Sequence, residues 1–407
     1  MRSVIRDFRR AVGLPGESHD ASRKATNVSE ASCVDERRLL VDVTEYLRFN
    51  WGTGIQRITN AFILRLTREP LEGYRVMFIF VDRAGKFKLA KNVGENLINE
   101  NDCEEINAVS SDVIFFLDFS PRLLPKQYSQ LKKWRRINIR MVFFVHDLLP
   151  NKRPEWFTAR GVKNFNRWAA LLARYGDKFL CLSDCTKTDL EDFLRKEKNY
   201  LPDNIVEKVN LELGWAPFSK IKFPEAKHPV ISGTSILMVG TIEPRKGHWQ
   251  VLRAFELLWE KQRDVKLIFV GRAGWGTIEL QKYMRSHSLF GQKLFWKDSS
   301  TDEELMTLYR QAAGVIVASE GEGFGLPLRE ALHYGKAVLA RDIPAFRECV
   351  DGKLTYFRGE SPQSLADAIL QWQDAIAREG NALPLGDQGA ISYSIKGFDA
   401  AVFEAKH

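Results

Sequence analysis

The fold of this chain is decided by the stretch Gly314-Val-Ile-Val-Ala-Ser-Glu-Gly-Glu-Gly-Phe-Gly-Leu-Pro-Leu-Arg-Glu-Ala-Leu332. It begins with a short apolar run, continues through closely spaced glycines, and then places Pro327 where the first turn of a helix would accept it. The glycines let the backbone approach a ligand closely and leave N–H groups free for an anion. The stretch therefore predicts a strand, a phosphate-binding loop and a helix, with Glu322 in the loop and Glu330 on the helix. The alternative is a glycine-rich turn with two solvated glutamates.

Similar apolar runs alternate with helical patterns along most of the 407 residues, as in a doubly wound sheet. We expect an α/β fold with two Rossmann-like domains that face each other across a cleft. The predicted strands are 39–43, 76–81, 113–117, 141–145 and 179–182 in the first domain, and 236–239, 265–270, 294–296, 315–318 and 337–340 in the second. The predicted organisation is a basic amphipathic start and flexible tail (1–36), a first domain (37–216), a linker (217–230), a second domain (231–390) and a C-terminal crossing helix (391–407).

Composition narrows the class of protein. The net charge of +8 requires an anionic partner. Zinc-finger spacing, an aromatic RNA-binding strand and long Lys/Arg blocks are absent from the sequence, so we expect no nucleic-acid partner. No run of roughly 18 or more apolar residues and no secretory leader is present. Five cysteines with scattered spacing fit a reducing compartment. The cysteine pattern and the lack of an apolar run and a leader together predict a cytoplasmic protein.

Two further motifs follow predicted strands. Gly240-Thr-Ile-Glu-Pro-Arg-Lys-Gly-His248 places the cations Arg245 and Lys246 before a helix, where they can flank a diphosphate and stabilise a departing nucleoside diphosphate without a metal ion. Trp51-Gly-Thr-Gly-Ile-Gln-Arg57 enters a helix at Gly54, whose backbone can face the same diphosphate. The alternatives are a solvated basic turn and a plain capped turn. His146 follows the strand 141–145, and at a strand end that faces a cleft we favour a functional role.

Together these motifs resemble the GT-B glycosyltransferases of family 4, a retaining group that includes bacterial mannosyl- and other hexosyltransferases of polysaccharide assembly. The most specific match is Glu322 followed after seven residues by Glu330, with Gly-Phe-Gly-Leu-Pro between them. Gly247 replaces an asparagine that is common in the family's Glu-Pro-Arg-Lys segment. The resemblance covers the chain from about Val41 to its end.

The resemblance implies a role for each matching residue. Arg245 and Lys246 would bind the donor diphosphate, Glu322 and His146 would lie at the transferred sugar, and these four form the predicted catalytic set. Glu330 would hold the ribose. The remaining predicted donor-binding residues are Gly54, Gly271, Arg272, Gly323, Phe324, Gly325 and Leu326. No metal and no cofactor is expected, because the nucleotide diphosphate sugar is a substrate.

The resemblance also implies retention of configuration by front-face attack, since no carboxylate is obviously placed as a nucleophile. The expected reaction transfers a hexose, with GDP-mannose the first choice of donor, to a glycan or lipid-linked acceptor in cell-surface polysaccharide synthesis. Basic amphipathic segments at 2–12 and 126–136 predict a peripheral contact with the anionic inner face of the plasma membrane; the alternative is a solvated helix face. The rival hypotheses are another nucleotide-sugar enzyme of this fold, such as an epimerase, or a non-catalytic nucleotide-sugar-binding module.

Overall fold

The computed structural model describes residues 37–48, 53–69, 71–90, 103–198, 205–215, 234–349, 354–379, 391–396, 398–399 and 403. The predicted amphipathic start and tail (1–36), the linker (217–230) and most of the C-terminal segment lie outside these ranges. Within them, none of the helices combines the length and the apolar character needed to span a bilayer.

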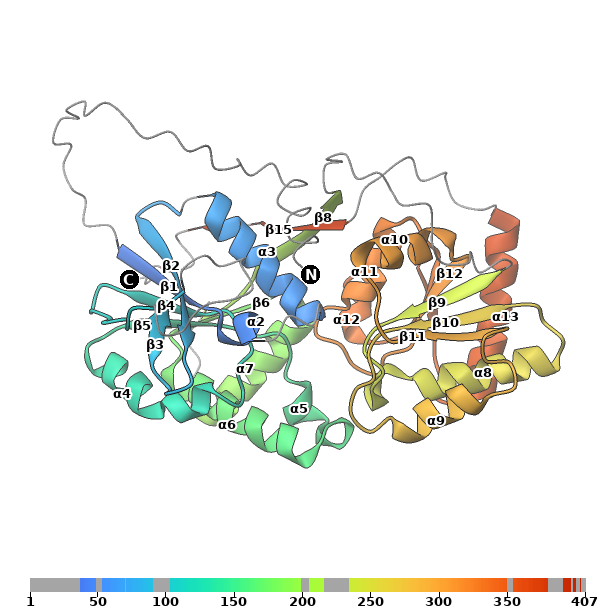
Figure 1. The fold of residues 1–407 in the computed structure, drawn as a ribbon, viewed down its shortest axis with the longest axis horizontal. Helices are drawn as coiled ribbons and strands as arrows, with labels where there is room; N and C mark the ends of the chain where they lie inside the picture. Colours follow the sequence, from blue (N-terminus) through green and yellow to red (C-terminus); the bar gives the residue numbers. More distant parts are fainter. Residues whose placement is uncertain are drawn as a thin grey trace, which may run out of the picture.

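The first domain contains a seven-stranded sheet in the order β3-β2-β1-β4-β5-β6-β7, in which only β3 is antiparallel (Figure 1). After β1 the chain adds β2 and β3 on one side of the sheet, and β4 to β7 then follow on the other side of β1. This order is typical of a dinucleotide-binding fold. Its strands are β1 (Arg37–Asp42), β2 (Tyr74–Val81), β3 (Phe87–Leu89), β4 (Val113–Phe116), β5 (Arg140–Phe144), β6 (Lys178–Cys181) and β7 (Val206–Lys208). Its helices are α2 (Thr44–Arg48), α3 (Gly54–Arg68), η2 (Leu124–Gln127), α4 (Tyr128–Arg136), α5 (Leu149–Lys152), η3 (Pro154–Trp156), α6 (Ala159–Tyr175) and α7 (Asp184–Lys198).

The second domain has a fully parallel six-stranded sheet in the order β11-β10-β9-β12-β13-β14. The topological switch lies between β9 and β12. The strands are β9 (Ser235–Val239), β10 (Lys266–Val270), β11 (Leu294–Lys297), β12 (Gly314–Val317), β13 (Val338–Arg341) and β14 (Leu354–Phe357). The helices are η4 (Pro244–Lys246), α8 (His248–Glu260), α9 (Ile278–Ser286), α10 (Asp302–Gln311), α11 (Leu326–His333), α12 (Pro344–Arg347) and α13 (Pro362–Glu379).

Each predicted strand coincides with an observed one, because parallel strands covered on both faces read as continuous apolar runs. In the first domain, Phe62 of α3 is fully buried and packs edge-on against Phe144 of β5 and against Phe398 near the C-terminus. The end of the chain therefore contributes to the core of the first domain.

The predicted crossing helix is wrong over its first residues. Residues Ile391–Lys396 form strand β15, which pairs antiparallel with β8 (Asn210–Trp215) in a separate two-stranded ribbon (Figure 1). The physical reason is the strict alternation of polar and apolar residues in Ile-Ser-Tyr-Ser-Ile-Lys, which has the period of a strand. The chain does return to the first domain, where Ile395, Phe398 and Phe403 pack in its core.

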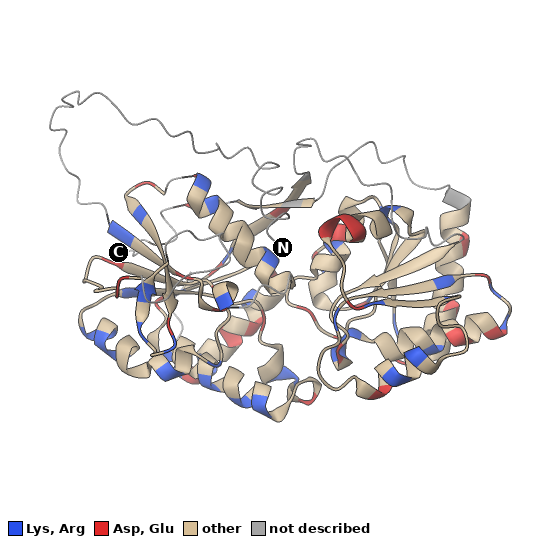
Figure 2. Cartoon of the chain, in the orientation of Figure 1, with Lys and Arg blue, Asp and Glu red and all other residues tan. Residues whose placement is uncertain are grey.

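Helix starts follow local capping chemistry. Thr301 and Glu304 form a capping box at α10, and Thr53 with Gln56 form another at α3. At α7 the Ser183 hydroxyl accepts the hydrogen bond from the Thr186 N–H, and Asp184 is the first helical residue. In Figure 2 the acidic first turn of α10 stands near the boundary with the first domain.

Candidate active site

The candidate site forms at the carboxyl ends of β9 and β12, on the two sides of the topological switch of the second domain, where open α/β sheets bind ligands. Gly240 after β9 and Gly247 before α8 have φ angles of 143° and 76°, a region that favours glycine. A side chain at Gly247 would also overlap the carbonyl of Ala318 after β12. The tight approach of the two loops brings the cations of one to the carboxylate of the other.

Glu322 receives both cations of the Gly240–His248 loop. The Lys246 Nζ lies 2.5 Å from Glu322 Oε1, and an Arg245 Nη lies 3.3 Å from Oε2. Burial raises the pKa of this carboxyl, but the charges of Lys246 and Arg245 outweigh it and lower the pKa to about 2. Arg245 also pairs with Glu243 at 2.7 Å. The Glu322 carboxylate is therefore ionised at physiological pH, and it holds the side chains of Lys246 and Arg245 where they can receive a diphosphate.

The first domain closes directly over this cluster. The carbonyl oxygen of Gly323 accepts hydrogen bonds from the Ser183 and Thr186 hydroxyls, at 2.5 and 3.2 Å. A methyl group on Gly323 would overlap the carbonyl oxygen of His146. Only glycine therefore allows the loop of the second domain to contact the end of β5.

The His146 ring lies at this contact with both nitrogens shielded from solvent, and neither has a hydrogen-bond partner among the described residues. Burial lowers its pKa to about 3, so the imidazole is neutral at physiological pH. A neutral imidazole can donate one hydrogen bond and accept another. His146 is thus suited to bind a hydroxyl group rather than to supply a charge.

Glu330 on α11 lies in a second polar cluster that also joins the domains. Its carboxylate accepts from Arg57 of α3 at 2.8 Å, from the Tyr393 hydroxyl of β15 at 2.5 Å and from the Tyr309 hydroxyl of α10 at 3.0 Å. The Glu330 side chain is 4% exposed. Burial raises the pKa of Tyr393 and the nearby Glu330 charge raises it further, so the phenol remains a donor.

The other predicted donor-binding residues lie in different surroundings, from the core of the first domain to the protein surface. Phe324 and Leu326 pack in the core of the first domain, and a methyl group at Gly54 would lie 3.2 Å from Leu326. Gly325 has a φ of 77° at the start of α11. Gly271 packs against the Gly240 carbonyl, while the Arg272 side chain is exposed. The roles expected of these residues remain predictions.

Three groups of the first domain were not predicted from the sequence: Arg57 at the Glu330 cluster, and Asp42 and Asp118 at two strand ends. Arg57 belongs to the Trp51–Arg57 motif, but its partner Glu330 lies far away in the sequence. The spacing of residues along the chain therefore does not predict this pair. Asp42 and Asp118, after β1 and β4, are buried carboxyls that accept backbone hydrogen bonds from Thr44 and Tyr46 of α2. Their position at strand ends is a signal that could have identified them. Burial raises their pKa values to about 6 and about 7.

Within the described residues, no group of three or more His, Cys, Asp or Glu side chains is arranged to hold a metal ion. Metal independence stays a prediction, and the positive charge at the site comes from Arg245 and Lys246. The two facing Rossmann-like domains, with paired polar clusters between them, define the GT-B class of fold.

Solved structures show the same fold. A structure of Anabaena HepE in complex with UDP and glucose matches with a TM-score of 0.55 and 15% identity, over 84% of this chain and 91% of that one. WaaG, a glycosyltransferase involved in lipopolysaccharide biosynthesis, matches with a TM-score of 0.53 and 15% identity, over 83% and 90% of the two chains. Likeness at this identity concerns the fold alone.

Sequence relatives are closer. The serotype-specific mannosyltransferase WbdA of Escherichia coli is 33% identical over 346 residues, which cover 83% of this chain and 41% of WbdA. The O-antigen chain mannosyltransferase B of the same species is 33% identical over 192 residues, or 44% and 49% of the two chains. The chain thus spans less than half the length of these relatives. Residues 225–375 match the family "Glycosyl transferases group 1", so the second domain contains a glycosyltransferase group 1 domain.

Proposed function

We propose that the chain is a retaining glycosyltransferase that transfers a hexose from a nucleotide diphosphate sugar to a glycan or lipid-linked acceptor in polysaccharide synthesis. The observation that carries the proposal is the Glu322–Lys246–Arg245 cluster, buried where the two domains meet. A group 1 domain and relatives named as mannosyltransferases support mannose as the sugar and GDP-mannose as the first donor to test.

The proposed mechanism uses the chain's own charges. Lys246 and Arg245 bind the diphosphate and stabilise the negative charge that develops as the bond between the sugar C1 and the phosphate oxygen breaks. The acceptor oxygen attacks C1 from the same face, and its proton passes to the departing phosphate oxygen. His146 holds a sugar hydroxyl, and Glu322 keeps the two cations in place. Closure of the domains at Gly323 excludes water from the reacting centre.

The first experiment measures donor binding by thermal shift with GDP-mannose, UDP-glucose and a dTDP-hexose. A donor at a hundred times its Kd stabilises the folded chain by about 2.7 kcal/mol. We expect the largest shift with GDP-mannose, and a larger shift with another nucleotide would replace mannose as the assignment.

The second experiment measures turnover and stereochemistry without an acceptor. Slow hydrolysis of GDP-α-mannose, followed by NMR, should first release the α anomer of mannose. First release of the β anomer would refute retention. Binding with no hydrolysis, and no transfer to cell-surface glycan extracts, would favour a non-catalytic binding module.

A further inference from the structure

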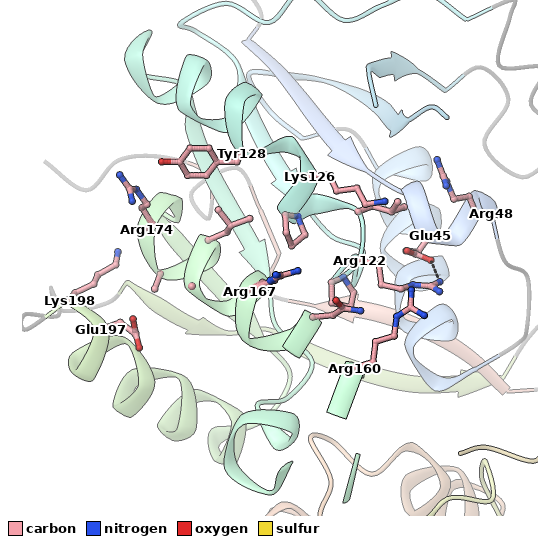
Figure 3. A pocket seen from close by; sticks show the side chains of 17 residues that line it. Glu45, Arg48, Arg122, Lys126, Tyr128, Arg160, Arg167, Arg174, Glu197 and Lys198 are labelled. Carbon is pink, nitrogen blue, oxygen red and sulfur yellow. Dashed lines mark ion pairs between the residues drawn. The ribbon is translucent and has the colours of Figure 1, made fainter. Parts of the chain in front are cut away.

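A groove of about 1310 Å³ lies on the first domain, away from the Glu322 cluster (Figure 3). Its walls come from α2, the loop after β4, η2, α6 and the end of α7. One end contains Glu45, Arg48, Arg122 and Arg160, and the other contains Tyr128, Arg174, Glu197 and Lys198, with Arg167 between them (Figure 3). Its length suits an extended ligand.

The groove is strongly basic. Seven of its lining residues are cations and two are carboxylates: Arg48, Arg122, Lys126, Arg160, Arg167, Arg174 and Lys198 against Glu45 and Glu197. Glu45 already pairs with Arg122, at 3.9 Å. Lys126, Arg160 and Arg167 are exposed, and no carboxylate among the described residues pairs with any of them. This unbalanced charge favours an anionic ligand.

Apolar side chains accompany these cations along the groove. Leu123, Pro125 and Leu171 line it together with Pro121, Ala170 and Ala173. The Tyr128 ring is 39% exposed at one end. Free inorganic anions need no apolar wall, and single-stranded nucleic acids are bound by stacked aromatic rings along a basic track. Cations beside an apolar strip fit a molecule with a phosphate group and a hydrocarbon part.

The groove is linked to the domain interface through the loop after β4. Phe119 in this loop packs edge-on against the His146 ring, with centroids 6.4 Å apart, and against Trp168 of α6, with centroids 5.2 Å apart. Arg122, three residues further on, lines the groove. The loop after β4 thus connects the groove with the domain contact at which His146 lies.

We propose that this groove binds a single phosphorylated amphiphile, with the phosphate on Lys126, Arg160 and Arg167 and the hydrocarbon part along Leu123 and Leu171. The role of this amphiphile as the acceptor, or as the carrier of the acceptor, rests on the proposed transferase function. Binding of the amphiphile in the groove does not rest on that function, because binding needs no sugar donor.

The test measures binding of decyl phosphate to the full chain by isothermal titration calorimetry, below its critical micelle concentration and at fixed salt. Decanol and inorganic phosphate are the matched partial ligands. We expect decyl phosphate to bind more tightly than either. The triple substitution Lys126→Ala, Arg160→Ala and Arg167→Ala should weaken this binding about tenfold or more, as expected for lost charge-assisted hydrogen bonds.

The control removes three exposed cations of α4 that lie outside the groove, by Lys132→Ala, Lys133→Ala and Arg136→Ala. Binding should then change by less than about twofold, a change within the screening expected for distant exposed charges. The proposal is overturned if the two triple variants weaken decyl phosphate binding equally. It is also overturned if inorganic phosphate binds as tightly as decyl phosphate, or if the chain binds only to vesicles of anionic lipid.

Donor thermal shifts are recorded on the same variants. A groove variant that keeps its GDP-mannose shift but loses decyl phosphate supports the groove independently of the transfer reaction. Failure of donor binding in the unsubstituted chain would count against the proposed function alone.

Discussion

Arg57 of the first domain donates a hydrogen bond to Glu330 of the second, with 2.8 Å between Nη1 and Oε1. The same guanidinium reaches Asp302 at 2.9 Å. Burial lowers the pKa of Arg57, but the charge of Glu330 and the further partners Tyr393 and Asp302 outweigh it and raise the pKa. The carboxylate expected to hold the ribose is thus set in place by a residue of the opposite domain, so we expect donor binding and domain closure to be coupled.

Arg57→Ala should therefore weaken both closure and donor binding. Loss of the cation leaves a buried carboxylate with two phenol donors, which should lower the free energy of unfolding by about 3 kcal/mol and raise the donor KM about tenfold. Chemical denaturation and steady-state kinetics measure the two effects. Arg68→Ala, an exposed cation at the end of the same helix, is the control. An unchanged KM would remove the coupling.

Lys246→Ala should lower kcat about a hundredfold or more, the scale of one lost donor to a developing negative charge. Glu322 would keep its pairing with Arg245, so the fold should survive. Single-turnover transfer measures the effect, and Lys282→Ala on the exposed face of α9 is the control. Equal turnover of the Lys246 and Lys282 variants would refute the leaving-group role.

Gly323→Ala should hold the domains apart. Its methyl group would meet the His146 carbonyl, whereas Gly54→Ala would meet only the flexible end of Leu326 at 3.2 Å. We expect a loss of transfer of about a hundredfold for the first variant, on the scale of a misplaced reacting group, and a small loss for the second. Small-angle scattering should show a larger radius of gyration for Gly323→Ala alone. An unchanged radius with full activity would show that the contact is not needed.

Asp42→Asn should alter the pH dependence of stability. Burial raises the pKa of Asp42 from 3.8 to about 6, so between these values the folded chain binds more protons than the unfolded chain. The free energy of unfolding therefore falls as pH rises through this window, by about 3 kcal/mol in total for this group. An asparagine oxygen can still accept both hydrogen bonds from Thr44, which go to one oxygen of Asp42.

Denaturation at several pH values between 4 and 7 measures this change, with Asp192→Asn on the exposed face of α7 as the control. We expect the pH slope to flatten for Asp42→Asn and to persist in the control. Equal slopes would mean that the carboxyl ionises in the folded chain as easily as in the unfolded one.

The strands, and the position of Lys246 and Glu322 at strand ends that face one cleft, could be predicted because both follow from local order. Buried parallel strands read as apolar runs, and residues just after such strands meet at one edge of the sheet. The Arg57–Glu330 pair could not be predicted from the sequence, because it depends on how the two domains approach each other. The family resemblance implies a helix at 391–407, whereas the alternation of Tyr393 and Ile395 with serines favours the observed strand β15. The basic groove could not be predicted from the sequence either, because its cations come from separate helices and loops.

The β8–β15 ribbon also limits how the protein can move. β8 precedes the segment that leads into the second domain, and β15 follows the segment that leads out of it, so both chain crossings start from paired strands with a fixed register. We expect a ribbon of fixed register to favour rotation of the domains about one axis over sliding of one domain on the other. Donor entry and product release would then follow a single, repeatable opening path, and each closure would return Arg57 and Gly323 to the same partners.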